Sequence, residues 1–169
     1  MINRLAEREL RTKFGTFKEI LYYDGQQESI ALVVGDVADQ DDVLCRIHSH
    51  CIGAHVFNSI ECDCREQMAA SQALIEQAGK GIIIWLDQEG KGNGHLALMQ
   101  SIPFKNAGIP QADAYVKAGY QADARSYRAA ADILSDLGVR SIVLLAHGQG
   151  KAKDLQKGSI IVSGTKQLT

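Results

Sequence analysis

Apolar and polar residues alternate over the first part of the chain, which is the pattern of strands with one buried face. The alternation predicts two strands at residues 2–9 and 16–23, joined by a turn at 12–15. Short apolar runs bounded by turn residues predict the remaining strands, at residues 30–34, 43–48, 82–86, 141–145 and 160–162.

Helical spacing of apolar residues begins after these first strands. It predicts helices over residues 64–77 and 126–137. A further helix is predicted over residues 95–105, and Pro103 is expected to kink or end it because proline lacks a backbone N–H.

This order of elements predicts a mixed α/β (α+β) fold in a single domain spanning residues 1–169. The N-terminal strands are expected to be antiparallel within a mixed β-sheet that is flanked by helices. Loops with functional residues follow several of the strands, so the site is expected at strand and loop ends. The tail at about residues 164–169 is expected to be flexible.

The composition narrows the class of protein. Hydrophobic residues make up 46% of the chain and charged residues 22%, with a formal net charge of −2, as in an ordinary globular protein. Without a basic stripe, a nucleic-acid partner is not expected. The chain has no apolar run of membrane-spanning length and no signal-like N-terminus, so we expect a cytoplasmic protein without a membrane partner.

Three of the four cysteines stand close together, as Cys51, Cys62 and Cys64. Zinc prefers sulfur and nitrogen ligands, and a site with three protein ligands leaves the fourth corner of the tetrahedron open for water. Two alternatives stay open from the residues alone. One is a structural site that His48 or His50 closes, and the other is a set of free thiols.

Several charged residues suggest contacts with phosphate. Arg46 directly precedes the cysteine segment, where a guanidinium can hold a phosphate at two points, although a surface ion pair is an equal alternative. The segment Gln88–Lys91 combines an amide, a carboxylate and a cation on a glycine-rich loop, which can read a base or sugar. This loop is not one of the known phosphate-binding fingerprints.

Two further segments have both a structural and a functional interpretation. Asp123 and Arg125 precede the predicted helix at 126–137, and from the sequence alone Asp123 is best interpreted as its N-cap. Lys151 follows glycines, as a phosphate-binding lysine would, but an exposed surface lysine is the default.

Taken together, these motifs resemble the signature of GTP cyclohydrolase II. This family of zinc enzymes opens the imidazole ring of guanine at the start of riboflavin synthesis. The resemblance extends from about Leu5 to Val162 with constant spacing between motifs. The residues that carry it are 46–51, 62–64, 67, 88–90, 122–125 and 151.

The resemblance implies a site and a reaction. It implies that Cys51, Cys62 and Cys64 hold one zinc ion, that water activated by zinc attacks C8 of the purine, and that formate is released. Arg125 matches a residue proposed to attack the α-phosphorus and release pyrophosphate, and Asp123 matches the neighbouring proposed base. Magnesium is expected with the substrate phosphates, and a homodimer is expected. The implied nucleotide contacts are Arg46, Ile47, His48, Ser49, His50, Gln67, Glu89, Gly90, Lys91, Gln111, Ala146 and Lys151.

The chain also departs from the family pattern. Ile102 stands where the family usually has a tyrosine proposed to assist the chemistry at C8, and His50 replaces an acidic residue. Gln111 replaces a small hydroxyl residue that contacts the nucleotide. Other departures are Arg65 for glycine, Asp87 and Lys91 for two arginines, and residues 146–150 for a different phosphate loop.

Because a site built to hydrogen-bond its substrate rejects analogues, these departures favour a specialised member of the family. Such an enzyme would act on another purine or pyrimidine compound, or would stop at the formamidopyrimidine. The remaining alternative is a non-catalytic, zinc-stabilised nucleotide-binding module in which His50 closes the metal site.

Overall fold

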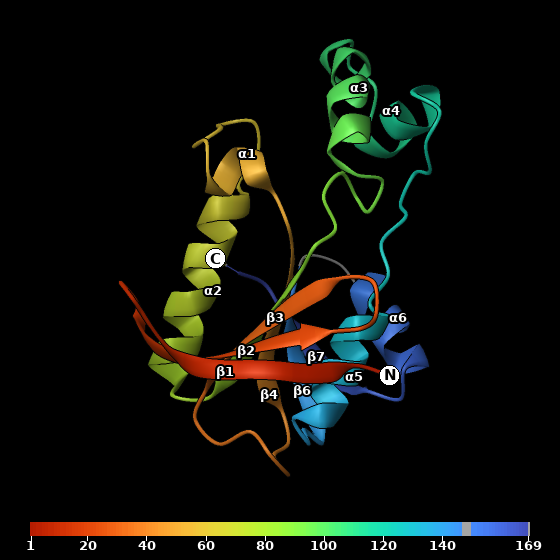
Figure 1. Cartoon of the computed structure of the whole chain (residues 1–169). Helices are drawn as coiled ribbons and strands as arrows, with labels where there is room; N and C mark the ends of the chain where they lie inside the picture. Colours follow the sequence, from red (N-terminus) through yellow and green to blue (C-terminus); the bar gives the residue numbers. More distant parts are fainter. Residues whose placement is uncertain (147–149, 169) are drawn as a thin grey trace.

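The computed structural model describes residues 1–146 and 150–168, and within them the chain forms one seven-stranded sheet (Figure 1). The strand order is β1-β2-β3-β5-β4-β6-β7. Strands β1, β2, β3 and β5 are antiparallel neighbours, whereas β5, β4, β6 and β7 run parallel. The bounds are β1 Asn3–Thr12, β2 Gly15–Tyr23, β3 Glu28–Val34, β4 Val43–Ser49, β5 Gly81–Leu86, β6 Ser141–Leu145 and β7 Ile161–Lys166. The predicted mixed α/β fold with antiparallel N-terminal strands is confirmed.

Helices cover both faces of the sheet, which therefore has a core on each side. Residues of β5 alternate between these cores: Ile82 and Ile84 pack with α5 and α6, whereas Ile83 packs with α2. The parallel strands β4, β5 and β6 end at the same edge of the sheet, where the candidate site residues follow. The helices are α1 Ile52–His55, α2 Cys64–Ala78, α3 His95–Asn106, α4 Gln111–Lys117, α5 Arg128–Asp136 and α6 Gly150–Lys157.

Helices α3 and α4 stand apart from the sheet and pack mainly against each other (Figure 1). We call this pair the α3–α4 lobe. The lobe joins the body of the domain through two segments, residues 87–94 and 118–127. Within the lobe Tyr115 is fully buried, and the Tyr120 hydroxyl donates to the Gln100 amide.

The last strand differs from its prediction. Strand β7 continues to Lys166 in parallel pairing with β6, so residues 164–166 are not the flexible tail that we expected. Leu168, just beyond it, is 9% exposed and packs in the α2-side core. The sequence looks like a tail here because β7 is an edge strand that is exposed along most of its length, and such strands accept polar residues.

The helices also differ from their predictions in part. Helices α1, α4 and α6 were not predicted, because elements of four to eight residues show little periodicity. Helix α3 continues past Pro103 to Asn106, so the proline does not end it. Helix α5 begins at Arg128, two residues later than predicted. No helix among the described residues is both long enough and apolar enough to cross a membrane.

Candidate metal centre and active site

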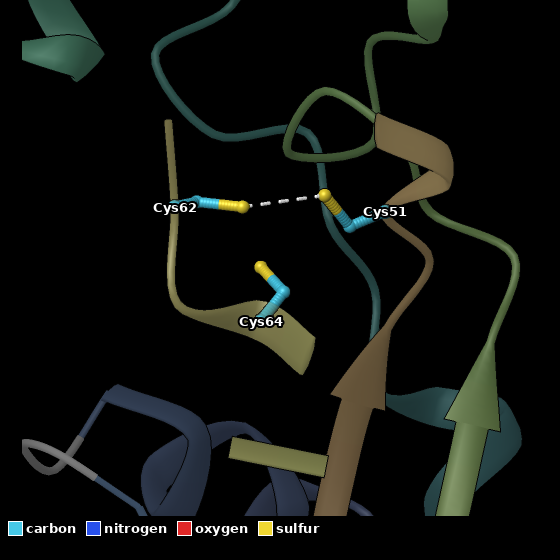
Figure 2. A group of neighbouring side chains, drawn as sticks. All are labelled: Cys51, Cys62 and Cys64. Atoms are coloured by element: carbon cyan, nitrogen blue, oxygen red, sulfur yellow. Dashed lines mark hydrogen bonds between the residues drawn. The ribbon is translucent and has the colours of Figure 1, made fainter. Parts of the chain in front are cut away.

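The three clustered cysteines come together at the edge of the sheet where β4 ends (Figure 2). Cys51 follows β4, Cys62 lies in the loop after α1, and Cys64 is the first residue of α2. All three sulfur atoms lie within 4.8 Å of one another, and Cys51 and Cys62 are 3.5 Å apart. Sulfurs around a tetrahedral zinc ion, with bonds of about 2.3 Å, stand about 3.8 Å apart, so the group fits zinc.

Backbone contacts hold the cysteine segments in place. The Ile52 N–H, next to Cys51, donates to the Glu89 carboxylate at 2.9 Å. Arg65, at the start of α2, donates to the carbonyl oxygens of Ala54 and His55 at 2.7 and 2.5 Å. Glu89 and Arg65 therefore act as anchors of the metal centre. The sequence did not reveal this, because both contacts depend on backbone positions that only the fold brings close.

Neither histidine proposed to close the metal site belongs to the cysteine group among the described residues. The His50 Nδ1 atom lies 3.1 Å from the Asp87 carboxylate, and its ring packs against Trp85. His48 is 2% exposed, with its ring centroid 5.0 Å from that of His55. Burial lowers the pKa of His48 to about 3, so its imidazole is neutral.

Two cations lie near the end of β4: Arg46 is buried, and Lys151 is half-buried. Arg46 is 5% exposed and donates to the Leu145 carbonyl at 3.0 Å and to the Gln67 amide oxygen at 2.6 Å. Lys151 donates to the Ile47 carbonyl at 3.0 Å. Burial, with help from the charges of Arg46 and Arg125, lowers the pKa of Lys151 to about 7. The alternatives of a surface ion pair for Arg46 and an exposed lysine at 151 are therefore wrong.

Several buried polar atoms without hydrogen-bond partners belong to the second half of β4, where Arg46 lies. The Arg46 Nε atom, both ring nitrogens of His48 and the Ser49 hydroxyl are buried without a hydrogen-bond partner among the described residues. The Tyr127 hydroxyl is in the same state. Since buried polar groups are normally hydrogen-bonded, their concentration at the end of β4 indicates a place for a polar ligand.

Arg125 and Asp123 form a bidentate ion pair. The Arg125 Nε and Nη2 atoms donate to the two carboxylate oxygens at 2.9 and 2.5 Å. The guanidinium holds the pKa of Asp123 below its usual range, and the carboxylate raises the pKa of Arg125. Asp123 is not the N-cap that we predicted: Tyr127 takes that position at α5, and Asp123 accepts from the Arg125 N–H instead.

The glycine-rich loop after β5 is tied to the segment that carries Arg125. The Gln88 amide donates to the Ser126 carbonyl at 2.9 Å and accepts from the Ser126 N–H at 2.6 Å. The Ala124 N–H donates to the Lys91 carbonyl, and a Cβ atom at Gly92 would approach the Ala124 backbone to 2.7 Å. The Gln88 side chain is therefore used by the fold, whereas we had expected this loop to read a base.

The remaining predicted residues are spread over two regions. Gly90 is buried in the loop, and Ala146, 3% exposed, directly follows β6. Gln111 is exposed at the start of α4, and Ile102 is partly buried on α3, so both belong to the α3–α4 lobe. The middle of the predicted phosphate loop, residues 147–149, lies outside the described residues.

Comparisons with known proteins identify the family of this chain. Residues 3–167 match the family described as GTP cyclohydrolase II. "Riboflavin biosynthesis protein RibBA" of Bacillus mycoides (strain KBAB4) is 40% identical over 158 residues, covering 92% of this chain and 40% of its own length. The protein of the same name from Mycobacterium avium (strain 104) is 41% identical over 158 residues, covering 89% of this chain and 37% of its own length. The chain thus spans about two fifths of the length of these relatives.

A solved structure shares the fold. It is described as RibBX, a two domain 3,4-dihydroxy-2-butanone 4-phosphate synthase from A. baumannii. The match has a TM-score of 0.54 and 19% sequence identity, and it covers 99% of this chain and 40% of that one. The family match spans almost the whole chain and includes every member of the cysteine group, so the chain belongs to the GTP cyclohydrolase II family.

Proposed function

We propose that this chain is a zinc-dependent hydrolase that opens the imidazole ring of GTP, with release of formate. The observation that carries the proposal is the three-cysteine group together with a cluster of three cations, which we define as Arg46, Arg125 and Lys151. Arg46, the buried member of the cluster, is within the influence of the Cys64 thiol. Only Arg125 of this cluster has a carboxylate partner among the described residues. A polyanionic substrate would supply the charge that the other two cations lack.

Cys51, Cys62 and Cys64 would hold the metal. Zinc bound by three thiolates supplies a Lewis acid that activates water, which is the chemistry that hydrolysis at C8 needs. Glu89 and Arg65 keep the cysteine segments in position through their backbone contacts. His48, buried and neutral, offers a ring nitrogen for hydrogen bonding to the purine.

The geometry favours a charge-holding role for Arg125. A nucleophilic guanidine must lose a proton, but Asp123 raises the pKa of Arg125, and a carboxylate with a lowered pKa is a weak base. In this arrangement Arg125 stabilises negative charge on the α-phosphate and Asp123 fixes its orientation. Release of pyrophosphate then requires water as the nucleophile: its oxygen bonds to the α-phosphorus as the bond to the leaving pyrophosphate breaks. Mg²⁺ bound to the phosphates is also part of the proposal. The place in riboflavin biosynthesis is likewise inferred from the names of the relatives.

A specialised reaction is the second candidate. Ile102 and Gln111 both belong to the helices of the α3–α4 lobe. The acidic residue and the arginine that the resemblance places at positions 50 and 87 are His50 and Asp87 here, and the two side chains contact each other at 3.1 Å. These departures bear on the base and on the second hydrolysis, whereas the three cysteines, Arg46, Arg125 and Lys151 match the family pattern.

Mass spectrometry of the products separates the two candidates. Zinc-loaded protein is incubated with GTP and Mg²⁺ and formate is measured, with Cys62→Ser as the inactive control. A diaminopyrimidine with formate supports the proposal, and an intact formyl group on a ring-opened product supports the specialised reaction. In that case Ile102→Tyr is expected to restore formate release. Unchanged GTP in the presence of folded, zinc-loaded protein would refute the proposal for GTP.

A further inference from the structure

Tyr127 is a buried aromatic residue that the resemblance does not mark as functional. It follows Arg125 by two positions, forms the N-cap of α5, and is 5% exposed. Its ring packs in the core that α5 and α6 form with the sheet, whereas its hydroxyl has no partner among the described residues. Phenylalanine or leucine could fill this position in the core equally well. Packing therefore does not explain why a tyrosine stands here, and the other contacts of its ring are relevant.

Two members of the cation cluster lie over this one ring. The Arg125 Cζ atom is 5.9 Å from the ring centroid, and the Lys151 Nζ atom is 6.0 Å from it. The two cations come from different segments, Arg125 from the 118–127 connection and Lys151 from α6. Tyr127 is therefore the contact that they share, and both distances are within the range of cation–π attraction.

The ring adds attraction to that of Asp123, which pairs with Arg125 and whose charge also raises the pKa of Lys151. Like charges repel, and the charge of Arg125 helps to lower the pKa of Lys151. A second acidic residue between them would hold the cations together but would also repel a polyphosphate. The negative face of an aromatic ring attracts cations without carrying a net charge, so the cluster keeps its positive charge for the substrate.

We propose that Tyr127 is a positioning residue that holds Arg125 and Lys151 together as one polyphosphate-binding unit. This inference rests on the proposed function in that the site takes a nucleotide triphosphate. Tyr127 itself does not touch the reacting atoms; it acts through the two cations. The essential property is the electron-rich face of its ring.

The test compares an electron-rich ring, an electron-poor ring of nearly the same shape, and a side chain without a ring. Position 127 is changed in three ways: Tyr127→Phe, replacement by 3,4,5-trifluorophenylalanine, and Tyr127→Leu. Fluorination withdraws electron density from the ring face while nearly keeping the ring's volume, so it weakens cation–π attraction but not packing. Each protein is zinc-loaded, and binding of inorganic tripolyphosphate and of guanosine is measured by calorimetry. Tyr23→Leu, on the exposed side of β2, is the control for a lost tyrosine.

Tripolyphosphate affinity is expected to stay within about threefold in Tyr127→Phe and to fall about tenfold in the fluorinated and leucine variants. Guanosine binding is expected to change less than twofold, because the nucleoside has no phosphate. Equal tripolyphosphate affinity in the phenylalanine and fluorinated variants would overturn the inference, and this comparison holds even where Tyr127→Leu fails to fold. An unaltered protein that binds no tripolyphosphate would overturn it as well.

The same series keeps the inference separate from the proposed reaction. GTP turnover is measured only on the unaltered protein. Turnover that is absent, while fluorination still weakens tripolyphosphate binding, refutes the proposed reaction and leaves the positioning role intact. If GTP is turned over but tripolyphosphate affinity does not respond to fluorination, the proposed reaction stands and the positioning role of Tyr127 is refuted.

Discussion

Replacing Lys151 with methionine is expected to stabilise the folded protein while it removes polyphosphate binding. Burial lowers the pKa of Lys151 from 10.5 to about 7. That difference corresponds to about 5 kcal/mol for keeping the ammonium charged in the folded state, and partial solvent access reduces it to about 3 kcal/mol. Loss of the hydrogen bond to the Ile47 carbonyl offsets about 1 kcal/mol. The variant should therefore gain about 2 kcal/mol in its free energy of unfolding at pH 6.

The direction in which stability changes with pH tests this argument. Between the folded pKa near 7 and the unfolded value of 10.5, the unfolded chain binds a proton at Lys151 that the folded chain does not. The stability of the unaltered protein therefore rises with pH across this window, relative to that of the variant. The gain of Lys151→Met should shrink from pH 6 to near zero at pH 10.

Urea denaturation of zinc-loaded protein at several pH values measures both effects. Lys153→Met, an exposed lysine on the same helix, is the matched control and should change stability by less than about 0.5 kcal/mol. Taking the difference between variant and parent cancels titration of the thiols and of other groups. A destabilised Lys151→Met protein, or a gain that does not vary with pH, would refute the reasoning.

Three further predictions concern the cysteine group and two hydrogen-bonded contacts of the fold. Cys62→Ser should reduce bound zinc from one per chain to less than about a tenth by metal analysis, whereas Cys45→Ala, at a buried cysteine outside the group, should keep it. Gln88→Ala removes both hydrogen bonds to Ser126 and should lower the free energy of unfolding, measured in urea, by about 1–3 kcal/mol. A loss below about 0.5 kcal/mol would show that these two hydrogen bonds do not stabilise the fold. Tyr22→Phe removes the 2.7 Å hydrogen bond to Asp136 and should cost about 1–2 kcal/mol by the same assay.

The sequence predicted the parts of the fold that depend on local pattern. Runs such as Ile82–Leu86 are apolar throughout because β5 is buried on both faces, and their identity as strands needs no knowledge of neighbours. The cysteine group was predictable for a similar reason, since a Cys-x-Cys pair with a nearby third cysteine has few other interpretations in a chain of this kind. Its geometry in the structure agrees with that prediction.

Contacts between distant segments were not predictable. Gln88 and Ser126 are 38 residues apart, and their side-chain-to-backbone pairing leaves no mark on polarity or spacing. The same holds for Glu89 and the Ile52 N–H, and for the ring of Tyr127 beneath two cations. Lys151 looked like a surface residue because nothing local indicates how α6 packs against the end of β4. Such residues are assigned by fold geometry, and a single sequence carries no signal for them.

The separation of the α3–α4 lobe from the sheet has an evolutionary consequence. Helices α3 and α4 pack mainly against each other, so a substitution on their outer surfaces does not disturb the two cores that stabilise the sheet. The lobe can therefore accumulate changes such as Ile102 and Gln111 with little loss of overall stability. Cys51 and Cys64 adjoin β4 and α2, whose packing builds those cores, and therefore lack this freedom. Members of this family can thus diverge in the lobe while they keep the cysteine group.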